Sequence, residues 1–353
     1  MFEKQRKWFL PWVKMVLLLF CLALPLPGFA ASVDQGKDVE GLLGLYQGDS
    51  GRFLIRERDG SLEMLYDVNP GKDEVVKDYA AYPLIRTAGD VFRWIGRGPL
   101  ADQLALARFQ RDSQGRGISC VIADKLFARR FYGPDKGETF KIVPLRTLDE
   151  LKKVAAQAVP PEENGIFSES DLVEIQTMEA SIHLEIRYAT TNNFMGIALY
   201  EQPRAFLQRP AAEALLRAHR TLSQYGYGII VYDAYRPWTV TKMFWEATPE
   251  PQRVFVADPA KGSRHNRGGA VDVGLYDLAT GVPVAMISGY DEFSPRAFPD
   301  FPGGTSQQRR DRELLRIVME GEGFTVYPEE WWHFDYKGWQ QFRIMNVSFA
   351  AIQ

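Results

Sequence analysis

Short runs rich in apolar residues, separated by turns with Gly and Pro, fill residues 38–147. The clearest example is a pair of runs at 53–58 and 61–66 joined by Asp59-Gly60. This dipeptide supplies the positive φ angles of a tight hairpin turn. Further runs of this kind lie at 91–94, 104–109, 117–122 and 126–131. The pattern predicts a small all-β domain, a barrel or a sandwich, over residues 38–147.

The second half of the chain mixes helical and strand periods. Residues 148–158 predict a short helix, and the proline-containing stretch 160–165 after it predicts a linker. Beyond the linker, the pattern predicts a strand at 182–188, a helix at 210–224, a buried strand at 228–232 and a helix at 310–320. We therefore expect residues 148–167 to join the β domain to an α+β domain over 168–350.

The first 30 residues have the order of a secretory signal peptide. Four basic residues (Lys4, Arg6, Lys7 and Lys14) precede an apolar run at 15–26, and Gly28-Phe29-Ala30 offers the small residues that a signal peptidase requires. The alternative is an uncleaved membrane anchor, but a spanning helix needs about 20 apolar residues and this run is shorter. We expect residues 1–30 to be cleaved, leaving no stable membrane span. The remaining protein is expected in the periplasm or another extracytoplasmic compartment.

Composition and cysteine content narrow the function. The chain has 353 residues, 46% of them hydrophobic, with a formal net charge of −3. Residues 1–30 hold four Lys or Arg and one Glu, so their removal lowers the net charge to −6. Nucleic-acid binding depends on clustered basic charge and is not expected. Cys21 leaves with the signal peptide and Cys120 is then alone, so any metal must be held by His and carboxylate side chains.

Two of the four histidines lie in unusual segments. In the first segment, His265 precedes Asp272 by seven residues, with Gly268 and Gly269 between them. The glycines allow a sharp turn. Residues 270–273 predict a strand, in which the side chain of Asp272 lies on the same face as that of the small residue Ala270. Small neighbours leave room for an ion, so His265 and Asp272 are candidate metal ligands.

The second segment places His333 among aromatic residues, three positions after Glu330. The aromatic neighbours are Trp331, Trp332, Phe334 and Tyr336. Such walls lower the local dielectric constant, which strengthens a metal's field and raises the pKa of a neighbouring carboxyl group. A general base requires that environment, and the Glu-x-x-His spacing favours Glu330 over the adjacent Glu329.

His265, Asp272 and His333 together predict one zinc ion per chain. Two neutral imidazoles and one carboxylate leave an open fourth position, where a catalytic zinc lowers the pKa of water to about 7. The alternative is that His265 lies in a polar loop and His333 packs as a core aromatic. That alternative is favoured for a lone histidine, but the four residues at these spacings favour a metal site. We expect His183 and His219 to be structural or surface residues.

The motifs Ser-x-His-x-x-Gly-x-Ala-x-Asp at 263–272 and Glu-Trp-Trp-His at 330–333 resemble those of the zinc D,D-peptidases, most closely the D-alanyl-D-alanine dipeptidases that include the dipeptidases of vancomycin resistance. The resemblance covers roughly residues 168–345. It also includes Arg187-Tyr188-Ala189-Thr190, Asn193-Phe194, Tyr235-Arg236-Pro237, Tyr290-Asp291-Glu292-Phe293-Ser294 and Gly323-Phe324. The β domain lies outside it.

The resemblance implies roles for three more residues. It implies that Arg236 stabilises the oxyanion, that Asp291 meets the free amine of the substrate, and that Ser263 hydrogen-bonds the substrate backbone. A fixed guanidinium suits the first role. For Ser263 a structural turn role is an equal alternative.

The sequence thus predicts an exported zinc D-alanyl-D-alanine dipeptidase that acts in peptidoglycan metabolism. Its expected partner is a small D,D-dipeptide, with peptidoglycan contact as a further possibility. The alternatives are a D,D-carboxypeptidase that trims longer stem peptides and a catalytically silent cell-wall-binding module. The sequence assigns no task to the β domain, and a scaffold or spacer is favoured there over a ligand-binding role.

Overall fold

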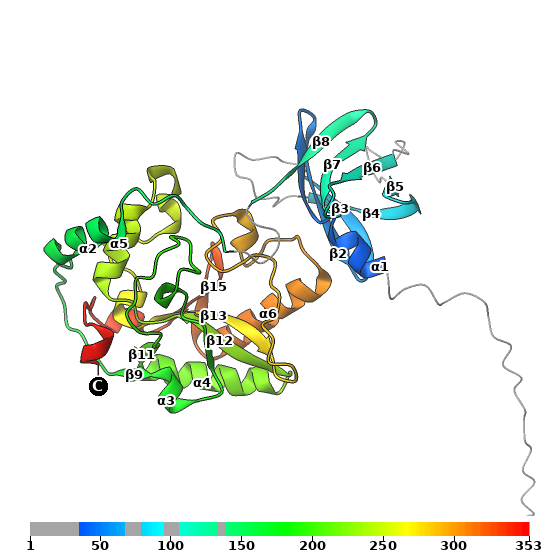
Figure 1. Cartoon of the computed structure of the whole chain (residues 1–353). Helices are drawn as coiled ribbons and strands as arrows, with labels where there is room; N and C mark the ends of the chain where they lie inside the picture. The colour runs from blue at the N-terminus through cyan, green and yellow to red at the C-terminus, as the bar shows by residue number, and fades with distance from the viewer. Residues whose placement is uncertain (1–34, 68–78, 95–105, 133–138, 353) are drawn as a thin grey trace, which may run out of the picture.

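The computed structural model describes residues 35–67, 79–94, 106–132 and 139–352. The signal peptide predicted for residues 1–30, and the start of the strand predicted at 104–109, lie outside these ranges. The described chain folds into a barrel and a larger domain of mixed helices and strands (Figure 1).

The N-terminal part is a closed barrel of eight antiparallel strands and not a sandwich. The strands are β1 (Gly44–Gly48), β2 (Gly51–Arg58), β3 (Ser61–Asp67), β4 (Tyr79–Ala88), β5 (Val91–Trp94), β6 (Leu106–Arg111), β7 (Gly117–Ile122) and β8 (Lys125–Arg130). A short helix, α1 (Gln35–Glu40), precedes them. The first strand pairs with both β2 and β8, which closes the barrel.

Inward-facing side chains of alternate residues fill the barrel, among them Phe53 and Ile55 of β2 and Cys120 of β7. The predicted hairpin is confirmed, with Asp59 and Gly60 at φ angles of 48° and 84°. The sequence pattern missed β1 and β4. Strand β1 is short and has Gly at both ends, and β4 contains Pro83. Gly and Pro both weaken the sequence signal for a strand.

The larger domain is built on a five-stranded sheet in the order β10-β12-β13-β15-β14. These strands are β10 (His183–Leu184), β12 (Tyr227–Asp233), β13 (Ala270–Asp277), β15 (Glu330–Tyr336) and β14 (Phe324–Tyr327). The β10–β12 pair is parallel and the others are antiparallel. A separate pair joins β9 (Leu172–Glu174) to β11 (Phe206–Gln208).

The helices of this domain are α2 (Leu148–Gln157), α3 (Ile175–Met178), α4 (Arg209–Ser223), α5 (Trp238–Ala247) and α6 (Ser306–Gly321). Short 3₁₀ turns are η2 (Arg187–Ala189), η3 (Glu250–Phe255), η4 (His265–Arg267), η5 (Pro295–Ala297), η6 (Trp339–Gln341) and η7 (Phe349–Ala351). The two long helices α4 and α6 contact each other and the sheet, whereas α2 packs on α5 (Figure 1). One apolar core joins these elements.

The predicted strand at 182–188 is wrong beyond Leu184, because the chain leaves the sheet and turns at η2. The side chain of Asn193 explains the turn, since its amide donates to the carbonyls of Arg187 and Thr190. A capping box at Thr305 and Gln308 starts α6 four residues before the predicted position 310.

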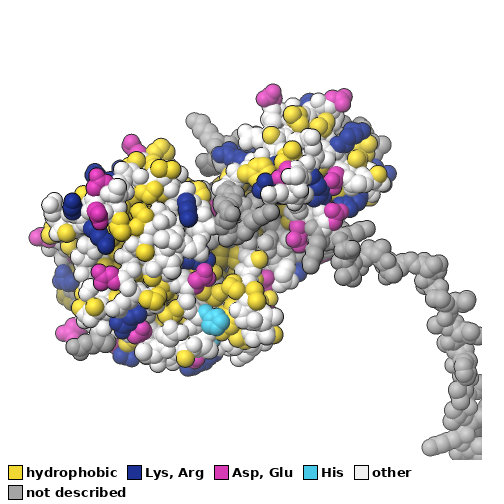
Figure 2. Space-filling view, viewed as in Figure 1, with side chains coloured by type: hydrophobic (Ala, Val, Ile, Leu, Met, Phe, Trp, Pro, Cys, Tyr) yellow, Lys and Arg dark blue, Asp and Glu magenta, His cyan; other side chains and the backbone are white. Residues whose placement is uncertain are grey.

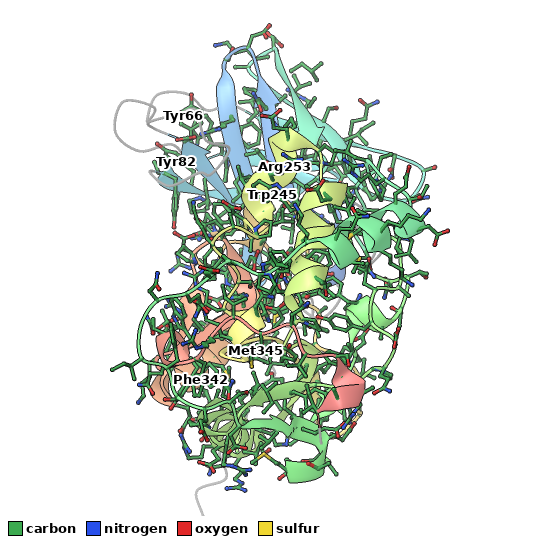
Figure 3. The ribbon with its side chains drawn as sticks, turned by 90° about the vertical axis from the view of Figure 1, so that its left-hand side faces the viewer. Tyr66, Tyr82, Trp245, Arg253, Phe342 and Met345 are labelled. Atoms are coloured by element: carbon green, nitrogen blue, oxygen red, sulfur yellow. The ribbon has the colours of Figure 1, made fainter. Side chains whose placement is uncertain are left out.

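Tyr66 and Tyr82 lie in the barrel at the top of Figure 3, and Phe342 and Met345 lie in the lower half of the larger domain. On the face drawn in Figure 2, acidic and basic side chains of the described residues are interspersed. No helix among the described residues is long and apolar enough to cross a membrane.

Candidate active site

The turn η4 holds His265 rigidly in the interior of the larger domain. Ser263 begins the turn, with its Oγ accepting from the His265 amide at 3.2 Å and its own amide donating to Asn266 Oδ1 at 2.8 Å. The chain then reverses at Gly268, whose φ of 65° is left-handed. Met345 braces the turn from the C-terminal segment by donating its amide to the carbonyl of Asn266. His265 is consequently fixed and only 2% exposed.

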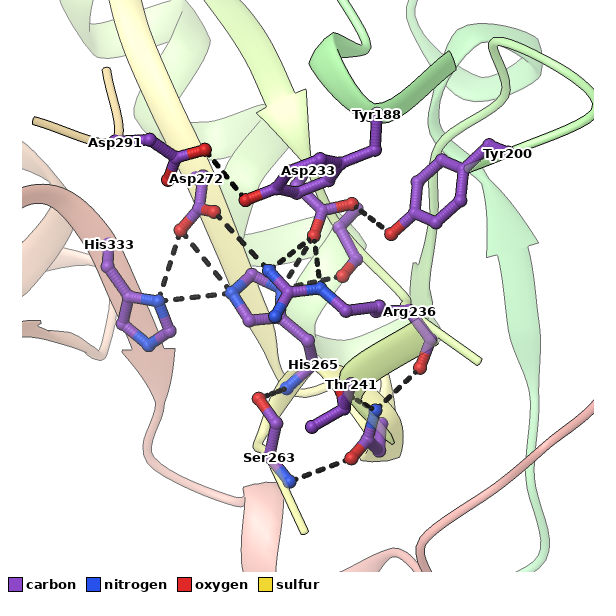
Figure 4. Close-up of polar contacts among 12 residues, drawn as sticks. Tyr188, Tyr200, Asp233, Arg236, Thr241, Ser263, His265, Asp272, Asp291 and His333 are labelled. Carbon is purple, nitrogen blue, oxygen red and sulfur yellow. Dashed lines mark hydrogen bonds and ion pairs between the residues drawn. The ribbon is translucent and has the colours of Figure 1, made fainter. Parts of the chain in front are cut away.

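Asp272 and His333 are brought together by strand register. They lie directly opposite each other on the antiparallel strands β13 and β15, where facing side chains are near neighbours. His333 Nδ1 lies 3.1 Å from Asp272 Oδ1, and His265 Nε2 lies 3.3 Å from the same oxygen (Figure 4). His265 and Asp272, which are close in the sequence, therefore meet His333 from a distant segment at one point.

The hydrogen bonds around this point leave two ring nitrogens and one carboxylate oxygen facing one another. His265 Nδ1 lies 2.7 Å from the carbonyl oxygen of Ala234, and His333 Nε2 lies 2.9 Å from Asp335 Oδ1. If those outer nitrogens carry the protons, the inner ones, which are 3.0 Å apart, carry lone pairs. Asp272 Oδ1 is buried and makes no hydrogen bond of good geometry. With neither a proton nor a metal ion between them these three atoms would repel one another, so the residues fit a metal ion.

Charge in the site also favours a cation. Burial opposes ionisation of Asp272, yet the two imidazoles hold its pKa well below its usual range. Burial likewise lowers the pKa of His333, but Asp272 and Asp335 outweigh it and raise the pKa to about 10. The same two carboxylates that attract a proton to His333 attract a metal ion in its place.

Glu330 lies beside these residues at the start of β15. Its Oε2 is 3.7 Å from His333 Nδ1, and its side chain is 22% exposed. Burial raises the pKa of Glu330 to about 7, with Asp272 adding to the shift and His333 opposing it. A carboxyl group with this pKa exchanges a proton readily near neutral pH. Glu329 is exposed and lies at the rim of the same cavity.

Arg236 follows β12 and is held by an ion pair with Asp233 at the end of that strand. Its Nε and Nη2 lie 2.9 Å and 2.7 Å from Asp233 Oδ2 (Figure 4). The other oxygen of this carboxylate, Oδ1, accepts a hydrogen bond from Tyr200 Oη. The guanidinium also stacks on the rings of Tyr188 and Phe244. Burial opposes its charge, but Asp233 raises the pKa of Arg236 above its ordinary value. The result is a fixed cation 4.0 Å from Asp272 Oδ2.

Asp291 is a buried carboxyl group on the segment between β13 and α6. Its φ of 58° is left-handed, and Tyr188 Oη donates to its Oδ2 at 2.8 Å. Burial and the charge of Asp272 raise the pKa of Asp291 well above its usual range. An ammonium group placed beside it would restore its charged form.

All seven residues predicted for the site line a single cavity of about 430 Å³. They are Arg236, Ser263, His265, Asp272, Asp291, Glu330 and His333. A larger hollow of about 630 Å³ lies between the barrel and residues 283–290, but none of the seven lines it. We therefore place the chemistry in the smaller cavity.

Sequence reasoning missed the residues that orient the site. Asp335 is two positions after His333 on β15, and strand alternation puts both side chains on one face. Asp233 ends β12 three residues before Arg236, a spacing that would have suggested a partner. Tyr290 donates to Asp272 Oδ2 at 2.8 Å, but nothing in its local sequence indicates that contact.

A cavity with converging metal-ligand atoms, a carboxyl group of pKa about 7 and a fixed guanidinium defines a metal-dependent hydrolase. Residues 168–349 match the family described as D-ala-D-ala dipeptidase, and the chain belongs to this family of zinc metallopeptidases. The barrel lies outside the matched residues.

Relatives from several bacteria carry the same description. The chain is 36% identical over 166 residues to a D-alanyl-D-alanine dipeptidase of Escherichia coli, covering 47% of this chain and 84% of that protein. It is 33% identical over 171 residues to one from Enterococcus faecium, covering 43% and 85%. A third, from Enterococcus faecalis, is 30% identical over 184 residues, covering 47% and 91%.

Proposed function

We propose that the protein hydrolyses the dipeptide D-alanyl-D-alanine to D-alanine with one zinc ion per chain. The observation that carries the proposal is the meeting of two imidazole nitrogens and one carboxylate oxygen within 3.3 Å of each other in the cavity. The family membership and the names of the relatives support the substrate.

His265, Asp272 and His333 are the proposed zinc ligands, through Nε2, Oδ1 and Nδ1. Two neutral nitrogens and one carboxylate are a donor set that catalytic zinc accepts. When bound there, zinc supplies a Lewis acid and lowers the pKa of water.

Glu330 is the proposed general base. It takes a proton from the attacking water and returns it to the amine that leaves, and its pKa of about 7 suits both transfers. Arg236 stabilises the negative charge that develops on the peptide carbonyl oxygen. Asp233 holds the guanidinium in place before the reaction starts, so little reorganisation is needed.

Asp291 is the proposed anchor for the substrate's free amine. A buried carboxyl group whose neutral form is favoured when alone gains an ion pair when an ammonium enters the cavity. Longer peptides carry their amine elsewhere and forgo this pair, which favours the dipeptide over stem peptides. The hydroxyl of Ser263 accepts a hydrogen bond from the His265 amide and also lines the cavity. It is proposed to contact the substrate backbone.

The proposed setting is outside the cytoplasm, after removal of residues 1–30, in peptidoglycan metabolism. The basic leader and apolar run support export. We propose a link to peptidoglycan through the dipeptide, which is one of its building blocks, and no direct contact with the polymer.

Release of D-alanine from the free dipeptide and from a pentapeptide ending in D-Ala-D-Ala tests the proposal, with zinc content measured on the same preparation. We expect one zinc per chain and a kcat/KM at least about tenfold higher for the dipeptide, since a lost charged hydrogen bond costs at least that factor. A preference for the pentapeptide would identify a D,D-carboxypeptidase instead. Zinc binding without hydrolysis of either peptide would indicate a cell-wall-binding module.

A further inference from the structure

The barrel carries an apolar row on its outer surface that the larger domain covers. Leu45, Leu54 and Leu65 lie directly opposite one another on the adjacent strands β1, β2 and β3. They alternate with the residues that fill the barrel, so they point outward. Outward-facing leucines of an isolated barrel would be exposed, yet these are only 3%, 1% and 0% exposed.

Two buried residues that bracket the segment carrying Asp291 form the centre of this cover, and the partly buried Tyr132 and Phe298 pack against it. Ile287 and Phe301 form one apolar cluster with the three leucines. We define residues 287–301 as the amine loop, since Asp291 lies on it. Both ends of the loop therefore pack on the same row of the barrel.

Polar contacts hold the chain just beyond the loop to the same side of the barrel. The amide of Glu57 donates to the carbonyl of Gly304 at 3.2 Å, and Glu57 Oε2 accepts from the Ser306 amide at 2.6 Å. Arg309 Nη2 donates to the Glu57 carbonyl at 2.8 Å. The start of α6 is thus fixed to β2, as is the end of the loop before it.

Inside the molecule the amine loop reaches the site. Tyr290 Oη donates to Asp272 Oδ2, and Ser288 Oγ accepts from Trp331 Nε1, both at 2.8 Å. Asp291 has a left-handed φ, a conformation that costs free energy in a residue other than Gly and persists where the surroundings hold it. The ends of the loop are held by the barrel, and its middle carries the side chain that selects the substrate.

We propose that the barrel is a positioning element for the reaction, which clamps the amine loop through Leu45, Leu54 and Leu65 so that Asp291 meets the substrate's amine. This inference rests on the proposed function of Asp291. It gives the barrel a task in substrate selection, whereas a spacer would leave selection unchanged.

A matched pair of truncations in the full chain tests the clamp. Leu54→Ala removes side-chain atoms from the row of leucines that Ile287 and Phe301 cover. Leu62→Ala removes the same atoms from the barrel interior, where Leu62 is 2% exposed and belongs to a separate apolar cluster. Steady-state kinetics are measured with D-Ala-D-Ala and with its N-acetyl derivative, which lacks the ammonium group. Hydrogen exchange of residues 287–301 is followed by mass spectrometry.

We expect Leu54→Ala to raise KM for the dipeptide by on the order of tenfold, because a charged hydrogen bond is weakened. The kcat/KM for the acetylated peptide, the zinc content and kcat should stay unchanged, and exchange in 287–301 should rise. Leu62→Ala should lower Tm without these changes. If Leu54→Ala does not fold, Leu54→Val with Leu62→Val as its control gives the same comparison with a smaller change.

Equal kinetics and equal exchange in the two variants, with an active wild type, would overturn the clamp alone. An inactive wild type would overturn the proposed function. Unchanged KM and peptide preference in Asp291→Asn would overturn the role of Asp291 and the clamp that depends on it.

Discussion

A pair of histidines lies near each end of strand β13, and the ring nitrogens of the two pairs have different kinds of partner. At the Asp272 end, His265 Nε2 and His333 Nδ1 lie 3.3 Å and 3.1 Å from the same carboxylate oxygen. At the Tyr276 end, His183 stacks on the Tyr276 ring with centroids 3.7 Å apart. His219 lies nearby in α4 with a partner for each ring nitrogen, the amide of Ile229 and the hydroxyl of Ser181.

The difference teaches that burial alone does not mark a functional histidine. His219 and His265 are 3% and 2% exposed. What separates them is where the second nitrogen points. In His219 the hydrogen bonds are complete, so the residue contributes to stability. In His265 and His333 the outer nitrogens face hydrogen-bond acceptors, whereas the inner ones converge on each other and on Asp272 Oδ1, where a metal ion could bind all three.

The largest effect is expected from His333→Ala. Removing one of three ligands should abolish stoichiometric zinc binding and lower kcat/KM by at least about 10³-fold, since the metal provides several kcal/mol of transition-state stabilisation. Zinc content by atomic emission and dipeptide turnover are the measurements. His183→Ala is the control from the other end of the sheet and should retain both. Full zinc occupancy in His333→Ala would contradict the proposed ligand set.

Glu330→Gln separates the base from the ligands. The variant keeps the shape of the side chain but accepts no proton, so kcat should fall by about 10²–10⁴-fold with zinc retained. Glu329→Gln changes the exposed neighbour and should have little effect. Turnover close to that of the wild type in Glu330→Gln would exclude the residue as the base.

Asp335→Asn tests the hydrogen bond at His333 Nε2, the ring nitrogen that faces away from the proposed metal site. The amide accepts the Nε2 proton less strongly than the carboxylate does, so zinc affinity should fall by about 10- to 100-fold. Competition with a fluorescent chelator measures this without reference to activity. Asp277→Asn, at the far end of β13, should leave the affinity unchanged. An unaltered zinc affinity in Asp335→Asn would show that the hydrogen bond between His333 Nε2 and Asp335 does not contribute to metal binding.

The sequence predicted more of the site than of its surroundings, for a physical reason. His265, Asp272, Glu330 and His333 carry chemistry that is visible in their own segments as unusual neighbours and spacings. The cross-strand register of Asp272 and His333, however, is set by the whole sheet. Tyr290 reaches Asp272 from a separate loop, and such a contact leaves no local pattern.

The fold divides in a similar manner. The Asp59-Gly60 hairpin and the helices α2 and α4 follow from local signals and match the prediction closely. The strand predicted at 182–188 had the correct alternation, but Asn193 turns the chain after Leu184. Closure of the barrel and its contact with the amine loop depend on pairings between distant segments, which periodicity does not specify.

The smallest effect is expected from His219→Ala, and it lies in stability alone. The change leaves the Ile229 amide without its acceptor, which costs about 1–3 kcal/mol of unfolding free energy at neutral pH, whereas the Ser181 hydroxyl still donates to Glu179. Zinc content and kcat should not change. Burial lowers the pKa of His219 below its ordinary value, with the opposing charge of Glu179 a smaller influence. The unfolded chain therefore binds a proton at a higher pH than the folded protein does.

As pH falls below about 6.5, the ordinary pKa of histidine, the wild type should lose the part of its stability that depends on neutral His219. The variant has no such group, so the difference in unfolding free energy between the two proteins should shrink with acidification. Urea unfolding of both proteins between neutral and mildly acidic pH measures that difference, and effects of pH on the zinc ligands cancel in it. A difference that grows as pH falls would mean that folded His219 favours its proton, and the contrast between the two ends of β13 would then fail.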